Sequence, residues 1–142
     1  MFHTLNDMAF HIETLSKNDW DKLFSLIPEI QSTEKFVVGG GLIEDKDDPF
    51  SFSITPVHVA KIVCDFEKIM NDLGLVIDFN WGSWDEGRIL ADNESFENLD
   101  SITLLKLLTA FIRNNRFCDG ALASRFENKS IVKILVQLKK KN

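Results

Sequence analysis

The stretch that most constrains the fold is residues 102–113, because a helix over these residues is apolar on most of its circumference. Its polar residues, Thr103, Lys106, Thr109 and Arg113, form only a narrow strip. A helix that is apolar on several sides must be covered on several sides by other elements. The sequence therefore predicts that this helix lies at the centre of a domain. Its apolar residues are Ile102, Leu104, Leu105, Leu107, Leu108, Ala110, Phe111 and Ile112.

Further helices are predicted on both sides of this central one by apolar spacing and by end signals. Pro28 should end or bend the helix that starts near residue 16. Gly74 should close a helix in which Pro56 takes the first position. Ser83 and Glu86 have the spacing of a capping box. The predicted capping residues are Thr4, Ser16, Thr55, Ser83, Asp100 or Ser101, and Ser130.

Residues 34–55 have a different pattern, which favours strands. Residues 36–38 are a short β-branched run, three glycines follow, and residues 50–54 alternate at period 2. We therefore predict a mainly α fold, a compact single-domain helical bundle of five to seven helices with a small antiparallel β ribbon. No linker or repeat divides the chain, so residues 1–142 are expected to form one globular domain.

Charge and hydropathy exclude several classes of partner. The formal net charge is −6, so the overall field repels nucleic acid and acidic membrane surfaces. No apolar run approaches the ~20 residues of a membrane span, and the first ten residues lack the features of a secretory signal. We expect a cytoplasmic protein with no nucleic-acid or membrane partner, while its oligomeric state stays open.

No metal, cofactor or catalytic site is predicted from sequence motifs. His11 and Glu13 form His-x-Glu, but the Pro-Cys-x-x-Cys that completes a zinc deaminase site is missing. The acidic residues 44–48 lack the glycine and distal glutamate of a calcium loop. The triple glycine is not followed by the Gly-Lys-Ser/Thr of a phosphate loop.

The end of the central helix provides a candidate binding surface. Arg113 and Arg116 suit the negative end of a helix dipole, and Asp119 suits a helix cap, so structural roles would explain all three. Beside Phe117, the same arginines would also recognise a carboxylate, a phosphate or an acidic peptide. Trp81 and Trp84 are either core plugs or the apolar wall of that surface.

Several segments together resemble a known family. They are residues 23–28, Phe50 with Phe52, residues 77–81 with Trp84, and residues 104–113 leading into Arg-Phe-Cys-Asp-Gly at 116–120. Over about residues 20–139 the chain resembles a family of small bacterial proteins known only as a domain of unknown function. The resemblance implies a compact single domain and supplies no reaction or cofactor. At residues 128–129 we would expect a family member to have glycine.

The function that these features favour is a small binding or regulatory module whose partner is a protein or a small anionic ligand. An alternative is an enzyme acting on a small substrate, with Cys118 or Asp119 reacting and Arg113 and Arg116 binding an anionic group. Cys118 has no base nearby in the sequence, and cysteine is among the most buried residue types. The interpretation as a binding module is therefore preferred over the enzyme.

Overall fold

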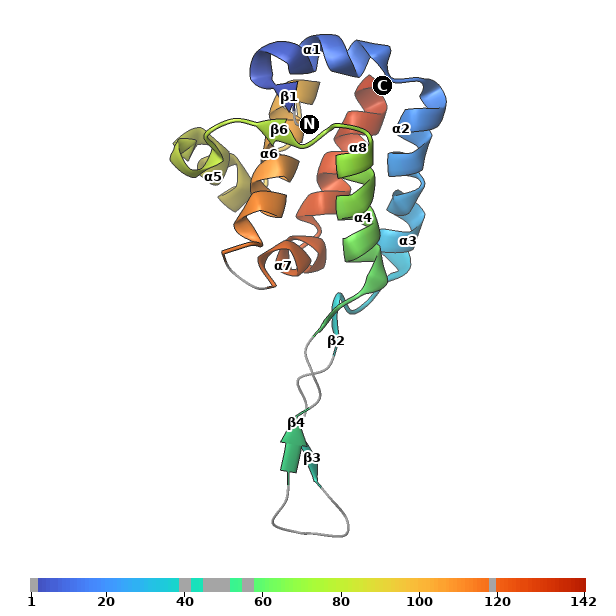
Figure 1. Ribbon diagram of the computed structural model, residues 1–142, viewed down its shortest axis with the longest axis vertical. Coiled ribbons are helices and arrows are strands. Elements are labelled where there is room, and N and C mark those ends of the chain that lie inside the picture. The colour runs from blue at the N-terminus through green and yellow to red at the C-terminus, as the bar shows by residue number, and fades with distance from the viewer. Residues whose placement is uncertain (1–2, 39–41, 45–51, 55–57, 118–119) are drawn as a thin grey trace.

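The computed structural model describes residues 3–38, 42–44, 52–54, 58–117 and 120–142. These residues are mainly helical, as predicted, with short strand pairs (Figure 1). The helices are α1 Leu5–Thr14, α2 Lys17–Phe24, α3 Leu26–Ser32, α4 Lys61–Asp72, α5 Asp85–Asp92, α6 Ser101–Asn114, α7 Ala121–Glu127 and α8 Ser130–Lys141. The other elements are β1 His3–Thr4, β2 Val37–Val38, β3 Leu42–Glu44, β4 Phe52–Ile54, β5 His58–Val59, β6 Ile77–Asp78 and the short 3-10 helix η1 Trp81–Ser83.

The central helix is α6, which confirms the sequence prediction. It contacts α1, α5, α7, α8, β6 and η1, and Figure 1 shows it beside α8 with α7 across their lower ends. Its start is fixed by Asp100, whose Oδ1 accepts a hydrogen bond of 2.8 Å from the backbone N–H of Thr103. Hydrogen bonding from the side chain and backbone of Thr103 lowers the pKa of the Asp100 carboxyl. Its buried residues are Leu104, Leu105, Leu107, Leu108, Thr109, Phe111 and Ile112.

Pro28 was predicted to end or bend the helix that starts near residue 16, and the helix is interrupted just before it. Proline has no N–H to donate to the carbonyl of Phe24, four residues earlier, and its ring crowds that carbonyl. The helix α2 ends at Phe24, Ser25 intervenes, and α3 begins at Leu26. Pro28 thus lies in the first turn of α3, where its missing N–H costs little.

The start of α4 differs from the prediction, which placed it at Thr55 and Pro56. Those two residues lie outside the described part of the chain. The residue preceding α4 is Ala60, and His58 and Val59 are in strand β5, paired antiparallel with β2. Ala60 N–H also donates to the Phe36 carbonyl at 2.8 Å. Strand pairing therefore holds this backbone extended up to Ala60, while the predicted end is confirmed by Gly74, at φ 69° just after the last turn.

The strand pairs are short and of two kinds. Both β2–β5 and β3–β4 are antiparallel, and β3–β4 lies farther from the helices (Figure 1). The pair β1–β6, which was not predicted, is parallel, with His3 opposite Ile77 and Thr4 opposite Asp78. Ile77 N–H donates to the buried Thr109 Oγ1 of α6 at 3.1 Å, so β6 is fixed to the central helix.

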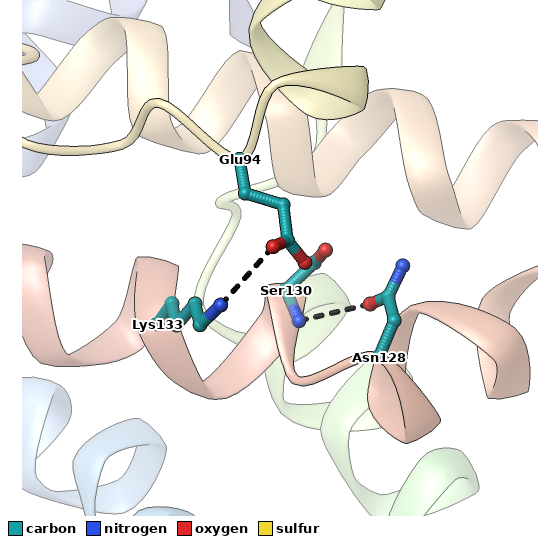
Figure 2. Close-up of polar contacts among 4 residues, drawn as sticks. All are labelled: Glu94, Asn128, Ser130 and Lys133. Atoms are coloured by element: carbon teal, nitrogen blue, oxygen red, sulfur yellow. Dashed lines mark hydrogen bonds and ion pairs between the residues drawn. The ribbon is translucent and has the colours of Figure 1, made fainter.

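The turn between α7 and α8 has the geometry that glycine favours, although no glycine is present. Lys129 lies in the left-handed region at φ 68°, and Asn128 Oδ1 accepts a 3.0 Å hydrogen bond from Ser130 N–H (Figure 2). Lys133 and Glu94 form an ion pair of 3.3 Å beside this turn (Figure 2). Ser130 was predicted to cap α8; this is wrong, because Ser130 is the first helical residue and its buried Oγ has no hydrogen-bond partner.

Helix α5 also begins differently from its prediction. The residue before the helix is Trp84, which makes no side-chain cap, so the predicted capping box of Ser83 with Glu86 does not form. Ser83 Oγ instead donates to the carbonyl of Asn80 at 3.3 Å, within the turn that η1 makes. This turn places Trp81 and Trp84 on the side of the chain that faces α6.

Candidate recognition site

The polar strip of the central helix faces the segment that runs from β6 through η1 to α5. Thr109 binds the backbone of Ile77, as described above. Lys106, one turn earlier, places its Nζ 4.1 Å from the centroid of the Trp84 ring and 5.2 Å from that of Phe79. Arg113, one turn later, lines a cavity at the end of the helix. The segment from β6 to α5 therefore packs against the polar strip of α6.

The first of two neighbouring cavities, here called the Arg125 cavity, has a volume of about 240 Å³. The helix α6 forms its floor through residues spaced three and four apart, which share one helical face. Arg125 reaches it from α7, with its guanidinium carbon 4.7 Å from the centroid of the Phe111 ring. The lining residues used below are Trp81, Trp84, Gly87, Arg88, Phe111, Asn114 and Arg125.

The second cavity, here called the Arg116 cavity, has a volume of about 370 Å³ and lies at the C-terminal end of α6. Its ring-bearing wall includes Trp81 and Phe117, whose ring centroids are 5.9 Å apart. Phe117 is 76% exposed, which is unusual for a large apolar side chain. Trp81 lines both cavities, so its indole is their shared wall. The lining residues used below are Asp78, Phe79, Trp81, Arg113, Arg116 and Phe117.

The two tryptophans differ in how they are held. Trp84 packs directly on Gly87: an added Cβ at residue 87 would lie 2.2 Å from Cε3 of the Trp84 ring. The same ring meets Phe79 edge-on at 5.7 Å and is covered by the Lys106 ammonium. Both rings are half-buried: Trp84 is contacted on several sides and borders the Arg125 cavity, whereas Trp81 borders both cavities.

All four arginines of the chain line these two cavities, and none of the lysines that the structure describes does so. They are Arg88 and Arg125 in one, and Arg113 and Arg116 in the other. The ion pairs between described residues are Lys61–Asp65 at 3.1 Å and Lys133–Glu94 at 3.3 Å. Arg88, Arg116 and Arg125 take no part in these pairs between described residues. The guanidinium group presents a planar fork of donors that matches a carboxylate or a phosphate.

The predicted site residues are brought together in large part. Trp81, Arg113, Arg116 and Phe117 line the Arg116 cavity, and Trp84 lines the neighbouring one. Asp119, and the Cys118 of the enzymatic alternative, lie outside the described residues. Arg88, Arg125 and Asp78 also line the cavities and were not among the predicted residues. The available signal was composition, since four arginines stand against twelve lysines in the chain.

Two further features can be judged within the described residues. No group of three His, Cys, Asp or Glu side chains comes together there in a way that would hold a metal ion. Nor does any helix there have the length and apolar character needed to cross a bilayer.

Comparison with known proteins identifies a family but no function. The model of a family of unknown function (DUF6508) matches residues 15–141, so the chain belongs to this family. No curated protein and no solved structure matches the chain.

Proposed function

We propose that this member of the family of unknown function (DUF6508) is a small cytoplasmic binding or regulatory module that recognises an organic acid at its paired cavities. The observation that carries the proposal is the gathering of all four arginines around Trp81. If the cations served only solubility, arginines and lysines would be expected to mix over the surface, whereas here the arginines line the cavities and the described lysines do not. Arginine combined with exposed aromatic rings is also the composition of binding hot spots.

Three of the arginines have no acidic partner among the described residues. Arg88, Arg116 and Arg125 form no ion pair with any described carboxylate. The Arg125 guanidinium is half-buried over the Phe111 ring, so a carboxylate or a phosphate that pairs with it forms a charge-assisted hydrogen bond in a lower dielectric, while the exposed Arg88 and Arg116 offer the same planar fork nearer to water. Such a bond is stronger than one made by an isolated surface lysine.

Titration calorimetry with small aromatic acids tests the proposal. The probes are 3-phenylpropionate and phenyl phosphate, with the uncharged 3-phenylpropanol as the matched control ligand. We expect heat from both acids and none from the alcohol. Hydrogen bonds to charged groups contribute about 1.5–3 kcal/mol, so Arg116→Ala should weaken acid binding by roughly 10- to 100-fold.

Two control variants separate recognition from net charge. Lys140→Ala removes one positive charge from the exposed end of α8 and should bind the acids as the wild type does. Arg116→Lys keeps the charge but loses the planar fork, so its affinity should be intermediate. Equal binding by Arg116→Ala and the wild type, or no binding of either acid at millimolar concentration, would overturn the proposal.

A further inference from the structure

Among the described residues that line the Arg116 cavity, one is negatively charged, Asp78, and simple acid recognition does not explain it. Asp78 is exposed, and its carboxylate accepts no hydrogen bond and forms no ion pair among the described residues. It therefore faces a cavity lined by Arg113 and Arg116 without neutralising Arg116. A carboxylate at this place weakens the binding of a simple anion, because like charges repel.

The backbone holds Asp78 at the cavity wall. Asp78 is the last residue of β6 and lies opposite Thr4 in the parallel pair with β1. The preceding residue, Ile77, is buried and donates its N–H to Thr109 of the central helix. Since successive side chains of a strand point to opposite faces, burial of Ile77 turns Asp78 outward. The position of the carboxylate is thus set by the same hydrogen bond that fixes β6 to α6.

The Arg116 cavity is lined by three kinds of side chain. Arg113 and Arg116 supply positive charge, and Asp78 supplies negative charge. Phe79, Trp81 and Phe117 supply aromatic rings. The volume of about 370 Å³ lies within the range of about 300–1,000 Å³ that is usual for small-molecule sites. The ligand that complements all three walls carries a carboxylate, an ammonium group and an aromatic ring.

We propose that the Arg116 cavity binds a free α-amino acid with an aromatic side chain. The α-carboxylate pairs with Arg113 and Arg116, the α-ammonium pairs with Asp78, and the side-chain ring packs against Trp81 and Phe117. This inference rests on the proposed function, since it names the acid that the arginines recognise. It adds a second requirement, the ammonium group, that a simple organic acid does not meet.

The test uses ligands that differ from L-phenylalanine by one charged group. Removal of the ammonium gives 3-phenylpropionate, and removal of the carboxylate gives phenethylamine. Phenylalaninamide and N-acetylphenylalanine represent the amino and carboxyl ends of a peptide. We expect L-phenylalanine to bind at least tenfold more tightly than each of the four analogues in titration calorimetry with the full chain.

The variants assign the ammonium to Asp78. Asp78→Asn should weaken L-phenylalanine binding at least tenfold, to the level of 3-phenylpropionate, and should leave 3-phenylpropionate binding unchanged or tighter. Asp72→Asn, at the exposed end of α4 and outside both cavities, is the matched control and should bind as the wild type does. Melting temperatures of both variants check that each is folded.

Each contrary outcome has a distinct meaning. If 3-phenylpropionate binds as tightly as L-phenylalanine, the cavity recognises acids alone, so this inference fails and the proposed function stands. If phenylalaninamide or N-acetylphenylalanine matches L-phenylalanine, the ligand is a peptide terminus and the inference also fails. If no probe binds at millimolar concentration, both the inference and the proposed function are wrong. An unchanged affinity in Asp78→Asn overturns the assignment of the ammonium site.

Discussion

Gly87→Ala is the substitution whose effect follows most directly from the structure. An ideal Cβ at residue 87 would lie 2.2, 2.5 and 2.6 Å from three atoms of the Trp84 ring, whereas ordinary contacts lie at 3.4–4 Å. The ring must therefore move by about 1 Å or α5 must shift. Phe79 and Lys106 lie against the ring as well, so moving it disturbs these contacts.

Two opposing effects set the magnitude. Alanine gains up to about 1 kcal/mol over glycine inside a helix, and overpacking costs about 1–3 kcal/mol. We expect a net loss on the order of 1–2 kcal/mol in the free energy of unfolding, measured by urea titration with far-UV circular dichroism. For a chain of this length the melting temperature should fall by about 3–8 °C. Because Trp84 also lines the Arg125 cavity, the variant should alter that cavity as well.

A control glycine and a double-mutant cycle make this expectation refutable. A Cβ at Gly82 would have only Asn80 Oδ1 within reach, at 4.0 Å, so Gly82→Ala should change stability by less than about 0.5 kcal/mol. In a Trp84→Leu background the clashing ring is gone, and Gly87→Ala should then stabilise the helix. If Gly87→Ala stabilises the wild type, or acts equally in both backgrounds, the described packing of Trp84 on Gly87 is wrong.

Three further substitutions test the helical body. Leu108 is fully buried in α6, so Leu108→Ala should lower the free energy of unfolding by about 2–5 kcal/mol. A loss below about 1 kcal/mol in a urea titration would mean that α6 is not the core. Asp100→Ala should cost about 1 kcal/mol at pH 7 through loss of the cap. The pKa of Asp100 is lowered in the folded chain, so this contribution is present above the unfolded pKa of about 3.9 and is lost as the pH falls through the lower folded pKa. The stabilities of Asp100→Ala and the wild type should therefore converge in acid. Asp100→Asn should stay close to the wild type at pH 7. Lys129→Gly should stabilise by about 1 kcal/mol because residue 129 is left-handed; calorimetric melting that shows the same gain for Lys129→Ala would contradict this reason.

Local signals predicted the parts of the fold that depend on local physics. The apolar circumference of residues 102–113 identified the central helix, and Asp100 was one of the two caps considered for it. The signal failed where a distant segment decides the conformation. Pairing with Val37 and Val38 keeps His58 and Val59 extended, although Pro56 suggested that a helix had already begun. Strands β1 and β6 are each two residues long and lie 74 positions apart in the sequence. Strands this short have no periodic pattern that would predict their pairing.

The same distinction applies to the candidate site. Arg113, Arg116 and Phe117 follow one another at the end of α6, so their proximity could be predicted from their spacing. Arg88 is on α5 and Arg125 is on α7, and only the packing of these two helices around α6 brings them to Trp81. Neither arginine has a local pattern that distinguishes it from an ordinary surface cation.

The placement of the three tryptophans gives the protein an internal optical reporter. The chain has no tyrosine, so indole dominates its ultraviolet fluorescence. Trp20 is 6% exposed and stacked on Phe24, so collisional quenchers in solution reach this ring poorly. Trp81 and Trp84 are both half-buried and both line the Arg125 cavity. Trp81 is the indole shared by both cavities. Quenching by iodide, an anion that the neighbouring arginines attract, therefore reports on Trp81 and Trp84 rather than Trp20, and a ligand seated in the Arg116 cavity would protect Trp81 without any label.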